Sequence, residues 1–413
     1  MTSSPGYDVL VVGARAAGAS LGLLLAKQGR RVLMVDRDEF PSDTMSTHFM
    51  NPMNVAYLRE LGILEDLLAA GFRKATRTRT WVGDCLVEGP AGPRGAFALA
   101  PRRKVLDQLL VDRAVAAGAE FRGRTRAERL LQEGGRVAGV VVRSAGGEPE
   151  EVRARVTVGA DGKDSKLAEW TSAEKYEEVP ALRPAYYAYF NGIEPLPVPA
   201  LELFFGGDQI GFLFPMRPGE DCVAIEMQPA DFEEFRRDAR GSFLNRISNL
   251  PGMELRLRNA EIEGKVIGIR GVANYFRKPF GPGWALTGDA GYLKDPSTGL
   301  GVGDALKGSL MLAPALGAAL DGAGWESTMS AFQQARDDWF RPFYQATLAT
   351  TRMADPNPEA VAWLRAVCGN PIATRTLMSQ MREAAAPVLP PGLAAGVGRI
   401  AGLYAREAPK ATA

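Results

Sequence analysis

The chain has 413 residues, 49 Lys and Arg against 48 Asp and Glu, a formal net charge of +1, and 46% hydrophobic residues. This length allows two or three domains, and the apolar fraction supplies a large core and excludes disorder as a global description. The balanced charge argues against a nucleic-acid binder. The three cysteines are odd in number and far apart, which excludes a disulfide framework, and a single histidine excludes a multi-histidine metal site.

No segment has the pattern of an export signal or a membrane span. The N-terminus lacks a basic region before its apolar run. The longest later apolar stretch, 309–320, contains Pro314 and is shorter than the roughly 20 residues that a span requires. We therefore expect a cytoplasmic protein without stable membrane insertion, whose cysteines are reduced and act as small buried hydrophobes.

The first 36 residues predict a βαβ unit. A buried strand over 7–12 leads into a glycine turn at 13–18, and a helix over 19–27 ends at Gly29. A second buried strand over 31–35 finishes on Asp36. This order is typical of a dinucleotide-binding fold.

The rest of the chain predicts two kinds of structure. Helices are expected over 54–68, with a break at Gly62, and over 104–117, followed by a hairpin around Gly134 and Gly135 and a strand over 152–159. Between residues 184 and 270 the pattern is that of an antiparallel sheet with one helix. The expected segments there are strands over 185–192, 201–205, 210–216 and 221–227 and the helix over 230–247.

The C-terminal part returns to a buried strand and then becomes helical. The strand covers 283–288, and a helix begins near Val302 after a glycine-rich loop. Helical periodicity continues beyond Trp325, interrupted from Pro356 onward by further prolines, and the tail at 407–413 is expected to be frayed.

The turn Gly13-Ala14-Arg15-Ala16-Ala17-Gly18 is a dinucleotide fingerprint with an arginine at its middle glycine. The guanidinium either lies against a pyrophosphate or merely swings away from it. Asp36 stands near the spacing at which an acid binds ribose hydroxyls, and an acid there favours an unphosphorylated ribose. The alternative is a turn that serves only strand–helix packing.

Two further motifs follow in the order of a known set. One is Gly159-Ala160-Asp161-Gly162 with Ser165, and the other is Gly288-Asp289-Ala290 with the loop from Pro296 to Val302. Together with the fingerprint they resemble the FAD-dependent monooxygenases of the p-hydroxybenzoate hydroxylase type, over about residues 7–320. The wider superfamily includes flavin-dependent halogenases and geranylgeranyl-reductase-like enzymes.

The resemblance implies a role for each matching position. The fingerprint would hold the FAD pyrophosphate, Asp36 the adenosine ribose, Asp289 the ribityl chain, and the loop before Val302 the flavin edge. Arg103, which opens a helix with Leu106 and Leu110, would reach the ribose and phosphates. The cofactor contacts that we expect are Gly13, Ala14, Arg15, Ala16, Ala17, Gly18, Asp36, Arg37, Thr47, Arg103, Ala127, Asp161, Gly288, Asp289, Pro296, Gly299, Leu300 and Gly301.

The sequence departs from the family pattern in two places. The His that often follows the Gly-Asp-Ala triplet is replaced by Gly291-Tyr292, and the later loop has the short form Gly299-Leu300-Gly301. This form is closer to the halogenase and reductase branches. The halogenase pattern Trp-x-Trp-x-Ile-Pro is absent, and the nearest stretch is 211–215. No second nucleotide fingerprint is present, which is compatible with these monooxygenases.

Candidate catalytic and substrate residues are His48 and a set of aromatic side chains. His48 follows the second strand, where a histidine near the flavin could act as an acid or base; the alternative is a structural, hydrogen-bonded histidine. The aromatic residues could form the floor of a substrate pocket or pack as core. They are Trp81, Tyr187, Tyr189, Phe205, Phe212 and Phe214.

The sequence thus predicts an α/β protein with a Rossmann-like FAD-binding lobe, an inserted, mostly antiparallel substrate lobe and a C-terminal helical region. The expected FAD-binding parts are 1–75, 101–180 and 273–322, the substrate-lobe parts 76–100 and 181–272, and the helical region 323–413. The resemblance implies an FAD-dependent monooxygenase of secondary metabolism with no metal. It would use NAD(P)H and O2 to insert one oxygen into a largely apolar, aromatic or polycyclic small molecule through a flavin C4a-hydroperoxide.

Other interpretations stay open at this point. The same fold could halogenate a substrate or reduce an isoprenoid double bond, and the chain could instead be a flavin-binding protein without turnover. The oligomeric state could be a monomer or a homodimer. The mass shift of a product, by one oxygen, one halogen or two hydrogens, would separate the enzymatic alternatives.

Overall fold

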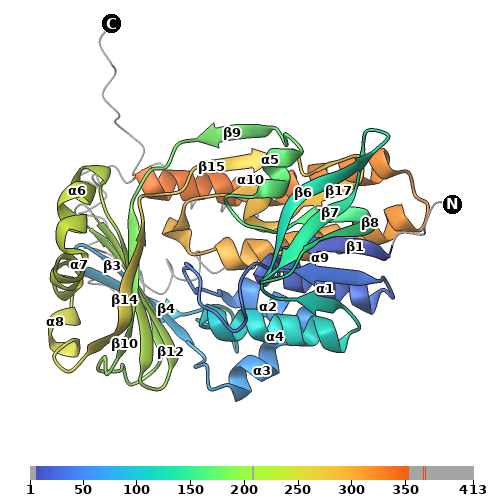
Figure 1. The fold of residues 1–413 in the computed structure, drawn as a ribbon. Coiled ribbons are helices and arrows are strands. Elements are labelled where there is room, and N and C mark those ends of the chain that lie inside the picture. Colours follow the sequence, from blue (N-terminus) through green and yellow to red (C-terminus); the bar gives the residue numbers. More distant parts are fainter. Residues whose placement is uncertain (1–5, 207–208, 353–365, 367, 369–413) are drawn as a thin grey trace, which may run out of the picture.

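The computed structural model describes residues 6–206, 209–352, 366 and 368. Two large sheets lie on opposite sides of the molecule, and the first is accompanied by long helices (Figure 1). A parallel Rossmann-like sheet, additional antiparallel strands and helices near the C-terminus confirm the predicted fold class. The prolines from Pro356 onward and the tail at 407–413 lie outside the described residues.

The first sheet is built on the predicted βαβ unit. β1 pairs in parallel with β2 on one side and with β8 on the other, and its residues from Val9 to Val12 are buried. Burial on both faces explains why these strands read as continuous apolar runs. Across the sheet the strands are β16 (Phe280–Gly281), β17 (Trp284–Leu286), β8 (Pro149–Gly159), β1 (Tyr7–Val12), β2 (Val32–Val35) and β5 (Glu120–Arg122).

A hairpin extends this sheet beside β8. β6 (Thr125–Glu133) and β7 (Arg136–Ser144) pair in antiparallel fashion, and β7 also pairs with β8. Gly134 and Gly135 form the turn with φ of 56° and 76°, a conformation that glycine adopts at little cost. The predicted glycine hairpin is therefore confirmed.

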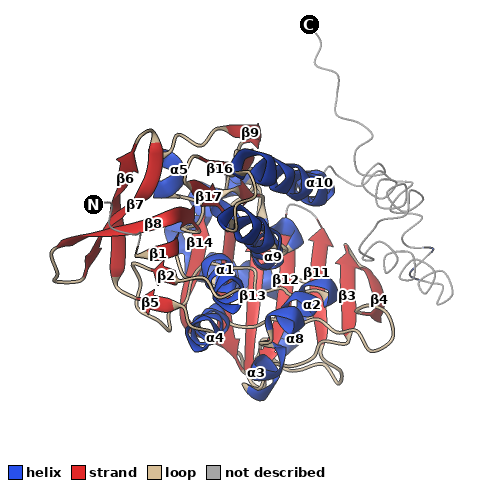
Figure 2. Ribbon diagram, turned by 90° about the vertical axis from the view of Figure 1, so that its right-hand side faces the viewer, coloured by secondary structure: helices blue, strands red, loops and turns tan. Residues whose placement is uncertain are grey.

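Helices cover the first sheet and extend toward the second (Figure 2). α1 packs between α4 and α9, and its buried small residues permit this close approach. The predicted break at Gly62 is confirmed, because this residue ends α2 in the left-handed conformation with φ of 80°. The helices are α1 (Ala16–Lys27), α2 (Pro52–Leu61), α3 (Leu64–Ala69), α4 (Arg103–Ala116), α5 (Lys166–Trp170), α9 (Gly301–Leu320) and α10 (Trp325–Arg352).

The second sheet contains all four predicted strands. It also contains β3, which pairs in parallel with β11 and lies in the segment 76–100 that we expected in the substrate lobe. At its two edges are β4 and β14, which the sequence pattern did not predict as strands. Across the sheet the strands are β14 (Glu261–Ile269), β10 (Ala185–Asn191), β13 (Glu220–Glu226), β12 (Gln209–Arg217), β11 (Ala200–Gly206), β3 (Arg77–Val82) and β4 (Cys85–Pro90).

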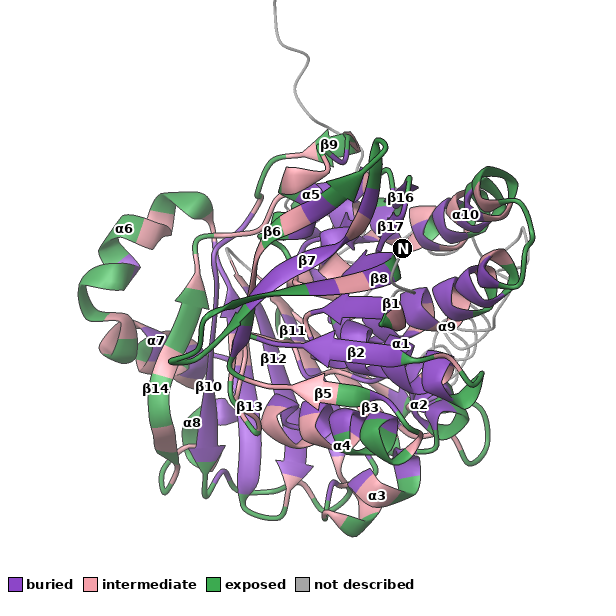
Figure 3. Ribbon diagram, turned by 45° about the vertical axis from the view of Figure 1, so that its right-hand side comes forward, coloured by how far each residue is buried: buried purple, intermediate pink, exposed green. Residues whose placement is uncertain are grey.

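The two faces of this sheet bury different residues. Tyr187 and Phe212 belong to the core shared with the first lobe, whereas the neighbouring Tyr186 and Leu213 pack under short helices on the outer face. These alternating directions follow from the period of two in a strand. Figure 3 shows the inner strands of the sheet as buried, whereas α6 (Phe232–Phe235) has exposed residues.

The predicted helix over 230–247 is wrong as a single element. Asp238 accepts a hydrogen bond from the backbone N–H of Gly241 at 2.9 Å, and this cap starts a new helix in the middle of the predicted one. The segment therefore consists of η1 (Pro229–Asp231), α6 (Phe232–Phe235), η2 (Arg236–Asp238) and α7 (Ala239–Ser248), followed by α8 (Met253–Arg256).

A small third sheet lies where the chain returns to the first lobe. Its strands are β18 (Tyr292–Leu293), β15 (Asn274–Arg277) and β9 (Lys175–Val179), and the short turns η3 (Gly288–Ala290) and η4 (Pro296–Thr298) flank β18. Among the helices that the structure describes, none has the combination of length and apolar character that crossing a membrane requires.

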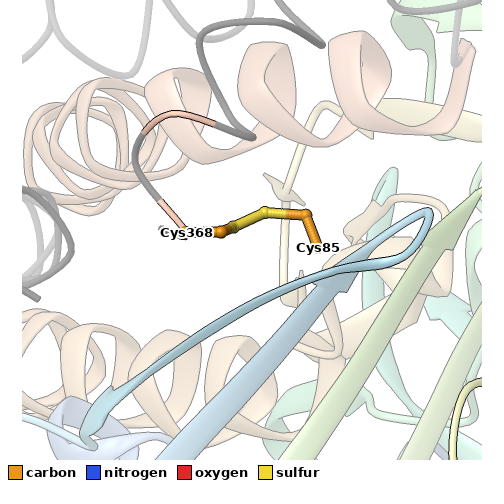
Figure 4. Close-up of a disulfide and its surroundings, with 2 residues drawn as sticks. All are labelled: Cys85 and Cys368. Carbon is orange, nitrogen blue, oxygen red and sulfur yellow. A yellow bond between two sulfur atoms is a disulfide. The ribbon is translucent and has the colours of Figure 1, made fainter. Parts of the chain in front are cut away.

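The expectation that all cysteines are reduced is wrong for two of them. Cys85 at the start of β4 and Cys368 are joined by a disulfide with 6.0 Å between their Cα atoms (Figure 4). Their separation of 283 residues concealed this pairing, because no sequence pattern brings them together. Cys222 is free and buried, as expected for a small hydrophobe.

Candidate active site

One cavity of ≈ 630 Å³ extends from the first sheet to the inner face of the second. Its wall contains the β1–α1 turn, the end of β2, the turn after β8, the β17–α9 loop and parts of β10, β12 and β13. Most of the expected cofactor contacts line it. They are Gly13, Arg15, Ala16, Ala17, Asp36, Arg37, Thr47, Arg103, Ala127, Asp161, Gly288, Asp289, Pro296 and Gly301.

The fingerprint glycines are required by close packing. Gly13 has φ of 96°, and a Cβ at this position would collide with the carbonyl group of Ala160. A Cβ on Gly18 would collide with the carbonyl of Gly13. Both Ala14 and Gly18 lie behind the cavity wall, so they shape the turn, while Ala16 and Ala17 place the N-terminus of α1 at the cavity. Free N–H groups at a helix N-terminus favour an anion.

The side chain of Arg15 is already bound by the protein. Its guanidinium donates to Asp38 at 2.8 Å, to Asp107 at 3.1 Å and to the carbonyl and hydroxyl of Ser42. Of the two alternatives that the sequence left open, this geometry favours the one in which Arg15 turns toward acidic partners and does not serve a pyrophosphate. Arg103 shares the same acid, with Nη2 at 3.0 Å from Asp107.

Asp36 is held at the cavity by two backbone donors. Its carboxylate accepts the backbone N–H groups of Ala14 at 2.7 Å and of Asp38 at 2.9 Å, which fixes its orientation at the cavity. Burial raises the pKa of this carboxyl group, while the two backbone donors oppose that shift. The side chain thus connects the glycine turn to the end of β2.

Asp161 contributes through its turn. Its carboxylate accepts from Ser165 Oγ at 2.5 Å and from the backbone N–H of Lys166 at 2.7 Å, so it caps α5. Asp161 and Gly162 both line the cavity.

Asp289 differs from the other acids because its carboxylate accepts no hydrogen bond from any described residue. It lines the cavity, and burial raises its pKa against the opposing charges of Arg103, Lys294 and Lys163. The preceding Gly288 packs tightly, since a Cβ there would lie 2.7 Å from the Cβ of Ala17. A partly exposed acid in a cavity wall without a protein donor suits a ligand that carries hydroxyl groups.

The loop before α9 brings a helix N-terminus to the cavity. Gly299 turns the chain with φ of 69°, and Gly301 and Val302 line the cavity at the start of this 20-residue helix. Gly299 and Leu300 themselves do not line it, although the sequence placed them among the contacts. The dipole of α9 stabilises negative charge at this end.

His48 lies outside the cavity lining. Its Nε2 is 3.1 Å from the hydroxyl of Tyr189, and the residue is buried. Burial and the charge of Arg103 lower the pKa of His48 to about 3. The burial of His48 and its low pKa favour a neutral, structural histidine over an acid–base residue.

The aromatic residues divide between the cavity and the core. Tyr187 and Phe212 line the cavity, next to Ala224 on the central strand β13. Phe214 stacks on Phe212 behind this wall, and Tyr189 packs under Arg102 at 3.9 Å from its ring. Phe205 also packs in the core, and Trp81 lies on the outer face of the sheet, so neither reaches the cavity.

The sequence analysis gave no role to several charged groups in the cavity wall. Lys294 pairs with Asp304 in the first turn of α9, and burial lowers the pKa of Lys294 to about 7. Glu226 and Asp295 also line the cavity and are buried. A weak signal for Glu226 existed: in the sequence of β13 it continues the alternation of Cys222 and Ala224, so it falls on the inward-facing side of the strand.

Comparisons with known proteins agree with this arrangement. Residues 6–187 match the protein family described as FAD binding domain. The chain is 27% identical over 349 residues to a 1H-pyrrole-2-carbonyl-[peptidyl-carrier protein] brominase of Pseudoalteromonas luteoviolacea, covering 82% of this chain and 83% of that protein. It is 28% identical to a digeranylgeranylglycerophospholipid reductase of Methanosarcina acetivorans, over 73% and 72% of the two chains.

Solved structures share the fold. The myxobacterial chondrochloren halogenase CndH has a TM-score of 0.77 and 21% identity, covering 96% of both chains. PqsL of P. aeruginosa, solved with 2-aminobenzoylacetate, has a TM-score of 0.74 and 20% identity over 87% of this chain and 99% of that one. Residues 6–187 therefore contain an FAD binding domain, and most of the chain is similar to a brominase and to geranylgeranyl reductases.

This FAD-dependent oxidoreductase has a cavity whose residues fit the cofactor. The glycine turn and the N-terminus of α1 fit a pyrophosphate, Asp36 fits a ribose, and the unpartnered Asp289 fits the ribityl hydroxyls. The N-terminus of α9 fits the flavin edge on which negative charge develops during reduction.

Proposed function

We propose that this enzyme is an FAD-dependent monooxygenase that inserts one oxygen from O2 into a largely apolar, aromatic or polycyclic small molecule. The observation that carries the proposal is the continuity of the cavity. Residues of the dinucleotide turn, such as Gly13, and aromatic residues of the second sheet, such as Tyr187 and Phe212, line the same space. A substrate on the aromatic wall would therefore stand beside the flavin.

The residues of the chain would bind and position the reactants. FAD, when bound, supplies the redox chemistry and the activation of O2. Asp36 and Asp289 would hold the two hydroxylated parts of the cofactor, and the N-terminus of α9 would stabilise its negative charge. Tyr187, Phe212 and Ala224 would exclude water from the reaction space and orient the substrate ring.

NAD(P)H is the reductant in this proposal. The chain has no second nucleotide fingerprint, which agrees with a transient hydride donor that binds without a domain of its own. The proposal also includes a cytoplasmic location and a monomer or homodimer as the active form. A cytoplasmic compartment keeps most thiols reduced, so the Cys85–Cys368 disulfide would there be open to reduction. The thiol content of freshly extracted protein tests this part.

Halogenation is the second candidate, and the likeness to the brominase favours it. The absence of the Trp-x-Trp-x-Ile-Pro pattern, with Gly211 to Pro215 at the corresponding stretch, opposes it. Reduction of an isoprenoid double bond is the third. Turnover of candidate substrates with NAD(P)H, O2 and halide, followed by mass spectrometry, separates them. Addition of one oxygen supports the proposal, whereas addition of a halogen or of two hydrogens contradicts it.

A further inference from the structure

A single acidic side chain interrupts the aromatic wall of the cavity. Glu226 is the last residue of β13, and its register partners on the neighbouring strands are Ala185 and Ile210. The alternation of β13 places Glu226 on the same face as Ala224, which lies between Tyr187 and Phe212. Glu226 is 2% exposed and nevertheless lines the cavity.

The carboxyl group of Glu226 faces that of Asp295, within hydrogen-bonding reach. Asp295 is 1% exposed and is fixed by its neighbours: its Oδ1 accepts the backbone N–H of Ser297 at 3.0 Å, and its own N–H donates to Asn274 at 2.6 Å. Asp295 Oδ2 and Glu226 Oε2 are both enclosed, and no described donor reaches either atom.

Two enclosed carboxyl oxygens without a donor can form a hydrogen bond only if one of them carries a proton. Burial and the charge of Asp295 raise the pKa of Glu226 well above its usual range, whereas Asp295 is also stabilised by the Ser297 N–H. Because the Ser297 N–H donates to Asp295, it favours the negative charge on Asp295 and the proton on the Glu226 side of the pair. The pair then has one shared proton and one negative charge, as in other close carboxyl pairs.

Other charged groups lie near the pair. Arg183, which precedes β10, attracts Glu226 but directs its Nε to the carbonyl of Thr351 at 2.6 Å. Lys294 is adjacent to Asp295 in the chain, and it pairs with Asp304 of α9. Asp289, from the turn before β18, adds a second negative charge to the same cavity.

One oxygen of Glu226 remains for a ligand. Oε1 accepts no hydrogen bond from a described residue, and unlike Oε2 it is not fully enclosed. With the proton on Oε2, Oε1 is a carbonyl oxygen, which can only accept a hydrogen bond. We propose that the Glu226–Asp295 pair binds an N–H or O–H donor on the ring system of the substrate and thereby fixes the orientation of the ring against Tyr187 and Phe212.

This inference rests on the proposed function, since it places the substrate on the aromatic wall beside FAD. It narrows the substrate class to aromatic molecules with a neutral hydrogen-bond donor, such as a phenol or a ring N–H. The pair would reject a carboxylate at the same position, because two negative charges would then face each other in a buried site.

Three naphthalene probes test the inference with the FAD-loaded full chain. They are 2-naphthol, which has a donor, 2-methoxynaphthalene, which lacks it, and 2-naphthoate, which is an anion. Binding is measured from the difference spectrum of the flavin. We expect 2-naphthol to bind roughly three- to tenfold more tightly than 2-methoxynaphthalene, the effect of one hydrogen bond. We expect 2-naphthoate to bind most weakly.

Two variants assign this preference to Glu226. Glu226→Gln keeps a carbonyl oxygen toward the cavity and an N–H toward Asp295, so it should retain the preference for 2-naphthol. Glu226→Leu removes the acceptor and should bind 2-naphthol and 2-methoxynaphthalene equally. Glu254→Leu, on the exposed surface of α8, is the matched control and should behave as the wild type.

If Glu226→Leu does not fold, the affinities of the wild-type protein for the three probes still test the inference. Equal affinity of the wild type for 2-naphthol and 2-methoxynaphthalene, no binding of any probe, or an unchanged preference in Glu226→Leu would each overturn the inference. The proposed function fails separately, if the protein does not retain FAD or adds no oxygen to any substrate.

Discussion

The guanidinium of Arg15 lies 3.1 Å from the carboxylate of Asp107, and this carboxylate is completely buried. Arg103 reaches the same acid at 3.0 Å. The pair connects the glycine turn of the first βαβ unit to α4, so the arginine that replaces the middle glycine of the fingerprint has a protein partner. Its contribution is therefore expected in stability rather than in the affinity for FAD.

The variant Arg15→Gly tests this role. It should bind FAD within roughly twofold of the wild type at low and at high salt, because no phosphate contact is lost. Its free energy of unfolding should fall by about 1–3 kcal/mol, because the buried Asp107 loses one of its two cations. FAD titration at both salt concentrations and urea unfolding provide the two values. A loss of FAD affinity that shrinks as salt rises would show instead that Arg15 binds the pyrophosphate.

The variant Asp289→Ala should weaken FAD binding roughly ten- to hundredfold, since a buried charge-assisted hydrogen bond contributes about 1.5–3 kcal/mol. Titration of the apoprotein with FAD measures the effect. Asp338→Ala, at a carboxylate that is 61% exposed on α10, is the control and should leave the dissociation constant unchanged. If Asp289→Ala also binds FAD as the wild type does, the Gly-Asp-Ala motif is only a turn.

The low pKa of His48 predicts that the stability of the protein decreases at acidic pH. Burial lowers its pKa to about 3, below the value of 6.5 that an exposed histidine has. At pH values between about 3 and 6.5, the unfolded chain binds a proton at His48 that the native protein does not bind. The contribution of this group to the free energy of unfolding is therefore fully present above pH 6.5 and is lost as the pH falls below it. At about pH 5, this one group should lower the free energy of unfolding by about 2 kcal/mol.

The variant His48→Gln, whose amide can replace the bond to Tyr189, should lose less stability between about pH 7 and about pH 5 than the wild type loses. Urea unfolding at both pH values gives the comparison. Identical losses in the two proteins would mean that His48 is protonated in the native state. Loss of oxygen transfer at unchanged stability and FAD content would restore it as an acid–base residue.

The number of free thiols tests the Cys85–Cys368 disulfide directly. Denatured protein prepared without reductant should contain one titratable thiol, that of Cys222, and three after reduction. Cys85→Ser should then release Cys368 and give two thiols without reductant. A count of three in the untreated wild type would show that Cys85 and Cys368 do not form the disulfide.

The elements that the sequence predicted well are those specified by local pattern. The βαβ unit follows from apolar runs and glycine positions within 36 residues, and the φ angles of Gly13 and Gly62 explain why glycine stands there. The edge strand β14 escaped prediction because one face of it is exposed, and its pattern of polar and apolar residues is weak. The capping role of Asp238 was likewise hidden inside an amphipathic stretch.

The residues of the site could likewise be predicted only where they belong to a local sequence pattern. Asp36 and Asp289 could be found because their motifs are contiguous in sequence. The Glu226–Asp295 pair and the Cys85–Cys368 disulfide join residues that only the tertiary structure brings together. The sequence predicted the aromatic residues as a group. Because alternate residues of a strand point to opposite faces of the sheet, Trp81 lies on the outer face and not at the cavity.

The central claim is that this cavity holds FAD, and the flavin released from the purified protein tests it most directly. We predict a yellow protein that releases FAD on denaturation, because Asp36 and the glycine turn bind the adenosine half that FMN lacks. Release of FMN alone, or a colourless protein that does not take up added FAD, would contradict the account.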